Sequence, residues 1–213
     1  HAYDPGYQVT FALMLTSAII TCTLTTRLKD HAKMSAQAAF RTKILFDTNQ
    51  LLQKAKSEEE IFSLTASQLI KLLNRSLIVY PEQNGDLGSE QVFGIDGEVP
   101  RNIFSAPKER DAANWTFANK KRSGAGTDSY PDAKGLYLAL RTGGGVFGVI
   151  GIDLSEKPLD AFENSVLLSI LGEGALAIEN RRNALEKEQA ALQARNEELR
   201  ANLLRTISHD LRT

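Results

Sequence analysis

The sequence predicts an α+β fold: an antiparallel sheet packed on helices, with a membrane helix before it and a long helix after it. Three observations support this prediction. Residues 9–26 carry no charge, the middle of the chain alternates short β-rich runs with turn residues, and no Gly or Pro occurs after Gly174. With 213 residues, the chain has room for one sizeable domain and two such appendages.

Residues 9–26 form the predicted transmembrane helix. As a helix, 18 residues rise about 27 Å, which is just enough to cross a hydrocarbon core. Eleven of them are apolar and the other seven are Thr or Ser. We expect the hydroxyls to bond back to carbonyls one turn earlier or to a neighbouring helix, so the span should pack in a bundle. The alternative is a buried helix of a soluble protein.

The charges beside this span predict its orientation. Arg27, Lys29 and Lys33 follow it, whereas residues 1–8 contain only Asp4 as a charged side chain. The positive-inside rule therefore makes residues 1–8 an extracytoplasmic loop and places the chain after residue 27 in the cytoplasm. No basic region precedes the span, which argues against a signal peptide. The expected location is the inner (cytoplasmic) cell membrane.

Composition excludes several classes of function. The net charge is −1, from 25 basic and 26 acidic residues, so no nucleic-acid partner is expected. Cys22 is the only cysteine, which rules out an internal disulfide, and the three histidines are scattered, so no metal or haem site is expected. The chain begins at His1 and ends inside a motif, and we expect it to be a fragment of a longer protein.

Residues 27–44 are expected to form a juxtamembrane helical linker, and residues 45–180 a sensor domain. A helix that leaves the membrane is expected at residues 30–56 and runs from the linker into this domain. The other expected helices cover residues 58–73 behind an N-cap at Ser57, residues 109–121, and a stretch from residue 161 that Pro158, Leu159 and Asp160 open. Its expected strands cover residues 76–80, ended by Pro81, residues 91–95, and residues 135–140 and 146–152, which a hairpin at residues 143–145 joins. A turn is expected at Asn84-Gly85-Asp86.

This order of elements fits a GAF or PAS fold, which often binds a small ligand between the sheet and the helical loops. Four aromatic residues are candidates for lining such a pocket: Trp115, Phe117, Tyr130 and Tyr137. The alternative is that they are ordinary core. The glycine-containing loop at residues 124–128 gives only a weak phosphate-binding signal, because it lacks the lysine and the spacing of a P-loop.

The predicted signalling helix, residues 181–205, carries a coiled-coil pattern. Apolar residues recur every seven positions at Leu171, Ile178, Leu185, Leu192 and Leu199. The partner positions are polar through the middle, with Asn196 among them. We therefore expect a weak parallel homodimer through the C-terminal helix, whose two packings lie close in energy. The alternative is a single solvated helix.

The chain ends with the string SHDLRT at residues 208–213. A neutral imidazole is nucleophilic, and the carboxylate of Asp210 beside His209 can hold the N–H of one ring nitrogen while the other attacks. Thr213 lies one helical turn beyond His209. The string resembles the H-box of sensor histidine kinases. Three segments, YDPGYQVTF, RSGAGTDSYPDAKGLYLALRT and PLDAFENSVLLSILGEGALAIEN, occur in the order typical of KdpD-type, potassium-responsive kinases, and extend the resemblance over most of the chain.

The resemblance implies a GAF domain and makes residues 206–213 the start of a histidine-phosphotransfer (HisKA) domain. It implies that His209 accepts the γ-phosphoryl group of ATP, that Asp210 orients and deprotonates the imidazole, and that Thr213 helps to place a water for dephosphorylating the cognate response regulator. ATP and Mg²⁺ would bind a kinase domain outside this chain. The 213 residues themselves should hold no cofactor and should be inactive alone. The output would control a potassium-uptake operon.

Two other functions stay open at this point. The chain could be a regulatory GAF module that binds a small ligand, or a passive dimerising spacer between membrane and kinase, in either case with no role in phosphotransfer. A specific ligand with micromolar affinity would argue against the spacer.

Overall fold

The computed structural model describes residues 5–95 and 103–210, in two compact units, residues 1–46 and 47–213. Helix α1 (Pro5–Leu52) runs unbroken through the predicted span and linker and ends before residue 56. In the first unit its large apolar side chains are exposed, among them Phe11, Met14, Ile19 and Ile20.

Threonine hydroxyl groups of the predicted span donate to backbone carbonyls within α1. Thr21 Oγ1 donates to the carbonyl of Ser17 at 2.8 Å, Thr25 to that of Thr21 at 2.7 Å, and Thr26 to that of Cys22 at 2.9 Å. Such bonds hide hydroxyl groups from an apolar surrounding. Exposed apolar side chains together with internally bonded hydroxyls suit a lipid environment, and the span at residues 9–26 stays a prediction.

The second unit contains a six-stranded antiparallel sheet. Its order is β2-β1-β6-β5-β4, and β3 also pairs with β1. The strands are β1 (Leu77–Gln83), β2 (Asp86–Leu87), β3 (Gln91–Phe93), β4 (Ser123–Gly124), β5 (Gly135–Arg141) and β6 (Val146–Asp153). The α+β prediction is confirmed, with the short strands β2 and β4 as additions.

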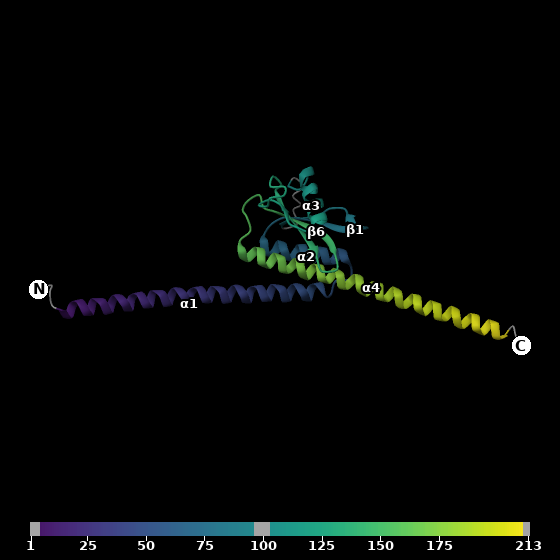
Figure 1. The fold of residues 1–213 in the computed structure, drawn as a ribbon, viewed down its shortest axis with the longest axis horizontal. Coiled ribbons are helices and arrows are strands. Elements are labelled where there is room, and N and C mark those ends of the chain that lie inside the picture. The colour runs from purple at the N-terminus through teal and green to yellow at the C-terminus, as the bar shows by residue number, and fades with distance from the viewer. Residues whose placement is uncertain (1–4, 96–102, 211–213) are drawn as a thin grey trace. The chain divides into compact units, whose positions relative to one another are not determined.

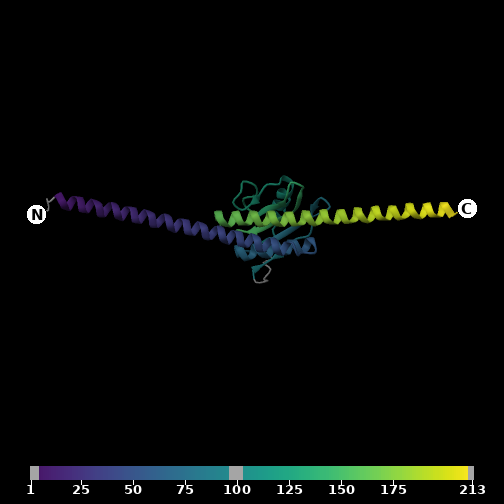
Figure 2. The ribbon, with the colours of Figure 1, turned by 90° about the horizontal axis from the view of Figure 1, so that it is seen from below.

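Three helices cover this sheet: α2 (Glu58–Leu73), α3 (Pro107–Asn119) and α4 (Ala161–Asp210). Figure 1 shows α3 on one face of the sheet and α2 with the first part of α4 on the other. Seen from below, α2 and α4 lie side by side (Figure 2). Among the described residues, one helix is long and apolar enough to cross a membrane, and it lies within α4. Of its apolar 18-residue stretch, 39% is buried inside the protein. Packing in the domain core explains that hydropathy.

Two hydrophobic layers follow from the alternation of side chains along the strands. On the α3 side, Ile78, Tyr80, Tyr137 and Val149 form a buried cluster with Ala112 and other residues of that side. On the other side, strand residues alternating with these are buried opposite α2 and α4, for example Leu77, Val79 and Ile150. A fully buried aliphatic side chain contributes about 1.5–3 kcal/mol, so these layers supply most of the force that holds the sheet and helices together.

Local signals account for the element ends that the sequence predicts. Ser57 caps α2 by accepting a hydrogen bond from the N–H of Glu60 at 3.2 Å. Asp160 caps α4: its Oδ1 accepts from the N–H of Glu163 at 2.7 Å, and Glu163 accepts in return from the N–H of Asp160 at 2.9 Å. Asn84 and Gly85 both have positive φ in the turn between β1 and β2, as a tight hairpin turn requires.

The predicted end of the first strand is wrong. Strand β1 continues through Pro81 to Gln83, and Pro81 lies opposite Gly148 of β6. The carbonyl of Pro81 accepts from the N–H of Gly88 at 2.8 Å. A proline is tolerated in a strand where no N–H is needed for the ladder, so Pro81 does not end the strand. The strand predicted at residues 91–95 is β3, which is shorter than predicted and ends at Phe93.

Candidate functional site

The point where α4 leaves the domain is the first candidate site. Leu171 and Ile178 are buried against their own domain, with 4% and 0% of their surface exposed, whereas Leu192 and Leu199 are more than half exposed. The predicted coiled-coil seam is therefore divided. Its first two positions pack inside the domain, and a surface for a second copy is available only from Leu185 onward, at 38% exposure.

Arg182 fastens α4 to the domain at this point. Its Nε and Nη2 donate to the two carboxylate oxygens of Glu58, at 3.0 and 2.9 Å, and its Nη1 donates to Glu82 at 2.7 Å. Its guanidinium also lies 5.2 Å from the centre of the Phe147 ring. A planar guanidinium suits this paired geometry, which lysine could not reproduce. One side chain of α4 thus holds the start of α2 and the end of β1.

These contacts shift the ionisation of Glu82. Partial burial alone would raise the pKa of this carboxyl, but the N–H of Gly85, at 2.8 Å, and the Arg182 guanidinium hold the pKa below its ordinary value of 4.5. Hydrogen bonds to Glu58, then to Glu82, raise the pKa of Arg182 despite its burial. The guanidinium therefore stays charged throughout the accessible pH range.

The depressed pKa of Glu82 predicts a loss of stability in acid. Above the unfolded-state value of 4.5, ionised Glu82 stabilises the folded domain, and this contribution is lost as the pH falls through the lower folded-state pKa. The difference in unfolding free energy between wild type and Glu82→Gln, measured by denaturant titration, should shrink as the pH falls below 4.5. A difference that stays constant down to about pH 3 would contradict this linkage.

The structure describes the phosphotransfer residues only in part. His209 and Asp210 lie in the last turn of α4. Thr213 lies outside the described residues. Their predicted roles therefore stay predictions, although α4 joins His209 to the sensor domain without a break over 50 residues.

The four candidate pocket aromatics do not come together around one cavity. Tyr137 is fully buried in the cluster beneath α3, and Phe117 packs against that cluster. Trp115 lines a separate cavity beside the end of β5, and Tyr130 is 38% exposed in the loop that precedes β5. Two of the four therefore belong to the core, which is the alternative that the sequence left open.

Glu109 is a buried acid that the sequence analysis did not single out. It lies in the first turn of α3 and is 1% exposed. Its Oε1 accepts from the N–H of Lys134 at 2.8 Å, and its Oε2 accepts from the N–H of Gly135 at 3.1 Å and from the Tyr137 hydroxyl at 2.7 Å. No sequence pattern marks such a residue, because its partners lie 25 to 28 positions along the chain.

The glycine loop before β5 is closed by its own backbone. Gly124 donates to the carbonyl of Ser129 at 2.7 Å, Ala125 to that of Gly135 at 2.9 Å, and Thr127 to that of Gly124 at 3.0 Å. Gly124 has a φ of +96°, and a Cβ there would lie 2.0 Å from the carbonyl oxygen of Gly135. These amides shape the loop and are not available to surround a phosphate.

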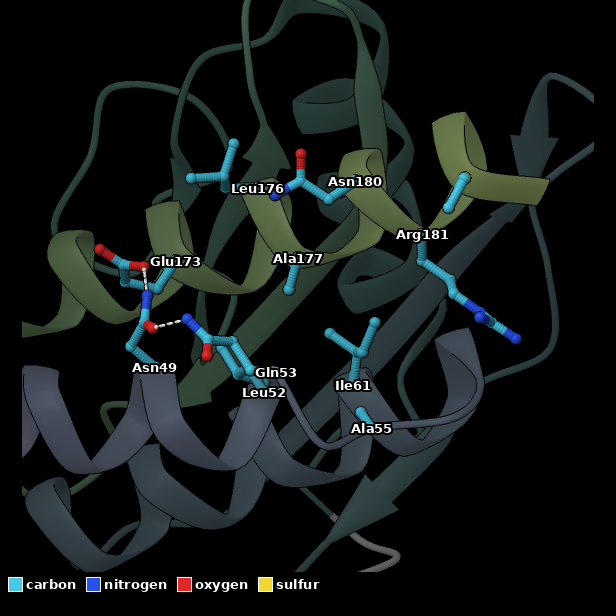
Figure 3. A pocket seen from close by; sticks show the side chains of 11 residues that line it. Asn49, Leu52, Gln53, Ala55, Ile61, Glu173, Leu176, Ala177, Asn180 and Arg181 are labelled. Carbon is cyan, nitrogen blue, oxygen red and sulfur yellow. Dashed lines mark hydrogen bonds between the residues drawn. The ribbon is translucent and has the colours of Figure 1, made fainter. Parts of the chain in front are cut away.

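A groove of about 320 Å³ lies between the end of α1, the start of α2 and α4 (Figure 3). Asn49 donates to Glu173 at 2.8 Å and accepts from Gln53 at 2.6 Å along its wall. Among the described residues no group of three or more His, Cys, Asp or Glu side chains could hold a metal ion. Three of the polar side chains in this groove, Asn49, Gln53 and Glu173, are therefore already paired with one another.

The chain is similar in sequence to two curated sensor proteins. The chain is 34% identical over 212 residues to the sensor protein KdpD of Clostridium acetobutylicum, covering 99% of this chain and 24% of that protein. It is 28% identical over 214 residues to the sensor protein KdpD of Escherichia coli K12, covering 99% and 23%. The chain thus spans about a quarter of the length of these curated relatives.

A solved structure supports the fold. The native GAF domain of the potassium sensor histidine kinase KdpD from Escherichia coli superposes with a TM-score of 0.52 and 22% identity, covering 71% of this chain and 99% of that domain. No protein-family model matches the chain. The domain between α1 and the exposed part of α4 therefore has a GAF fold.

Proposed function

Because this chain is homologous to a segment of the KdpD sensor proteins and carries a GAF fold, we propose that it is the sensory and signal-relay region of a membrane-bound, two-component sensor histidine kinase. The observation that carries the proposal is the continuity of α4. Its N-terminal part is core of the GAF domain, and its last turn contains His209. A change in the domain can therefore reach the histidine through one rigid element.

The proposed chemistry is transfer of the γ-phosphoryl group of ATP to His209. Asp210 would hold the imidazole in the nucleophilic tautomer, and Thr213 would help to place the water that dephosphorylates the cognate response regulator. ATP and Mg²⁺ would be supplied by a kinase domain outside these 213 residues. The response regulator would in turn control a potassium-uptake operon.

The proposed assembly is a parallel homodimer. Leu185, Leu192 and Leu199 repeat every seven residues and are exposed on α4, which supports a short coiled coil beyond Arg182. Two His209 side chains would then be carried by two adjacent helices. Residues 9–26 would anchor the dimer in the inner membrane, with the chain after residue 27 in the cytoplasm.

Replacing His209 tests this function. Full-length protein incubated with radiolabelled ATP should gain label that is labile in acid and stable in base, and His209→Gln should abolish it while the fold and the dimer persist. His31→Gln is a matched control, because His31 is an exposed histidine of α1. Label that survives in His209→Gln, or that His31→Gln removes equally, would refute the proposal.

A further inference from the structure

The sheet has an open edge where β4 ends. Strand β5 pairs with β4 only at Leu136 and Tyr137, and it then continues to Arg141. On its other side, β5 stays paired with β6 along this length. Within residues 5–95 and 103–210, no strand pairs with β5 beyond Tyr137 on the β4 side. Residues 138–141 therefore present a free edge to a further strand.

The backbone groups along this edge point outward at every second residue. The carbonyl of Gly135 accepts from the N–H of Ala125 at 2.9 Å, so the backbone of Gly135 faces the β4 side. Because this direction alternates along a strand, the N–H and C=O groups of Ala139 and Arg141 face the same side. Both residues lie beyond the last pair of the β4–β5 ladder, which joins Ser123 and Tyr137. They are the groups that an added strand would pair with.

A cavity of about 870 Å³ runs along the free edge, and side chains from both faces of the sheet line it. Trp115 of α3 is partly buried on one face, and Leu168 of α4 is 51% exposed on the other. Figure 1 shows these two helices on opposite faces of the sheet. A strand laid along the edge would alternate its own side chains between the two faces, so each face offers it an apolar contact.

The charges of the cavity select the sign of its partner. Its charged lining consists of four cations and one acid: Lys120, Lys121, Arg122, Arg141 and Asp128. The formal net charge of this lining is +3, four positive minus one negative, in a chain whose net charge is −1. None of the four cations forms a salt bridge with another described residue. Like charges would repel a second copy of this edge, whereas an acidic strand would be attracted.

We propose that this edge binds an extended acidic segment of a partner protein, which adds a strand to β5 beyond the end of β4. The main chain of that segment would pair with Ala139 and Arg141, and its acidic side chains would face the four cations. Its apolar side chains would contact Trp115 and Leu168. This goes beyond the proposed function, because it gives the GAF domain a protein partner of its own. Binding needs neither His209 nor ATP, so the two proposals can fail separately.

The first experiment is a peptide titration. The 213-residue chain in neutral detergent is titrated with a capped hexapeptide of alternating glutamate and valine, followed by calorimetry and by the emission of Trp115, the single tryptophan. The acidic peptide should bind saturably. Methylation of its backbone nitrogens keeps every charge but removes the donors of the added strand, and should abolish binding. Lysine in place of glutamate should abolish binding as well.

Three variants of the chain locate the site. Arg141→Gln should weaken peptide binding about tenfold, the scale of one charge-assisted hydrogen bond. Ala139→Pro removes an N–H that faces the free edge, where a proline is tolerated in a strand, and should also weaken binding about tenfold. Arg195→Gln, on the exposed part of α4, is the matched control and should leave binding unchanged. Circular dichroism should show that all three variants are folded.

Four results would overturn the inference. The first is no saturable binding of the acidic peptide at millimolar concentration. The second is equal binding of the methylated peptide, or equal weakening by Arg195→Gln, either of which would indicate attraction by charge alone. The third is binding of phosphatidylglycerol vesicles but not of the peptide, which would make the edge a membrane contact. The fourth is a change of oligomeric state in Arg141→Gln without peptide binding, which would make it a contact between two copies. None of these results would alter the phosphorylation of His209.

Discussion

Glu109→Ala should lower the free energy of unfolding by about 3–5 kcal/mol. The carboxylate is 1% exposed and accepts two backbone N–H groups and the Tyr137 hydroxyl. Removing it leaves three donors without an acceptor, two of them buried, and each buried donor left unpaired costs about 1–3 kcal/mol. The loss would also detach the first turn of α3 from the start of β5.

Substitutions around Glu109 should rank in a defined order. Burial, followed by the hydrogen bond to Glu109, raises the pKa of Tyr137 far above its ordinary value of 10.0, so the phenol stays a donor. Tyr137→Phe removes one donor and leaves the carboxylate with two, and should therefore cost less than Glu109→Ala. The loss of unfolding free energy for Glu109→Gln should lie between the losses for these two variants, because the amide N–H group would face groups that are themselves hydrogen-bond donors.

Urea denaturation followed by Trp115 emission measures this order, since Trp115 lies on the same helix as Glu109. Glu186→Gln is the matched control, at an exposed position of α4. If Glu109→Ala unfolds at the same urea concentration as Glu186→Gln, the buried carboxylate does not hold α3 in place.

Arg182→Ala should separate the sensor domain from its output helix. Arg182 is the last residue of α4 that is partly buried, and the side chains of residues 183–205 are exposed. The substitution leaves Glu58 and Glu82 facing each other without a cation. The stability loss should be about 1–3 kcal/mol, between the values for exposed and buried ion pairs. The full-length protein should keep basal phosphorylation of His209 and lose its dependence on the stimulus.

The adjacent Arg181 supplies the control, because it forms no salt bridge with any described residue. Phosphorylation is measured with and without potassium limitation in wild type, Arg182→Ala and Arg181→Ala. Retained regulation in Arg182→Ala would show that the signal does not pass through this contact. Loss of basal activity as well would show a folding defect, which denaturation of the same variant detects.

The sequence predicts those parts of the fold that depend on neighbours in the chain. Ser57, Asp160 and the Asn84-Gly85 turn fix element ends through contacts over a few residues. It does not predict the pairing of Arg182 with Glu58 and Glu82, which lie 124 and 100 positions away. Arg182 occupies a polar heptad position and looks like part of a seam, because periodicity cannot show which turn of a helix is covered by its own domain.

The candidate ligand site follows the same rule. Aromatic residues near the middle of the chain indicate a pocket, but burial divides them between the core and the sheet edge. The cavity beside the end of β5 is lined by four cations from both sides of β4, and these come together only when β5 pairs with β4 and β6: Lys120, Lys121, Arg122 and Arg141. A phosphate-loop pattern is a local signal, whereas this charge cluster is a property of the assembled sheet.

Helix α4 is unbroken from Ala161 to Asp210, so the number of residues between two positions fixes the angle between them about the helix axis. Arg182 and His209 are 27 positions apart on one helix, and each residue turns an α-helix by about 100°. One added residue between them would swing the histidine to a different side of the helix, while seven added residues, nearly two full turns, would almost restore its direction. The direction in which the proposed phosphate acceptor, His209, projects from the helix relative to Arg182 is therefore set by the number of residues between them.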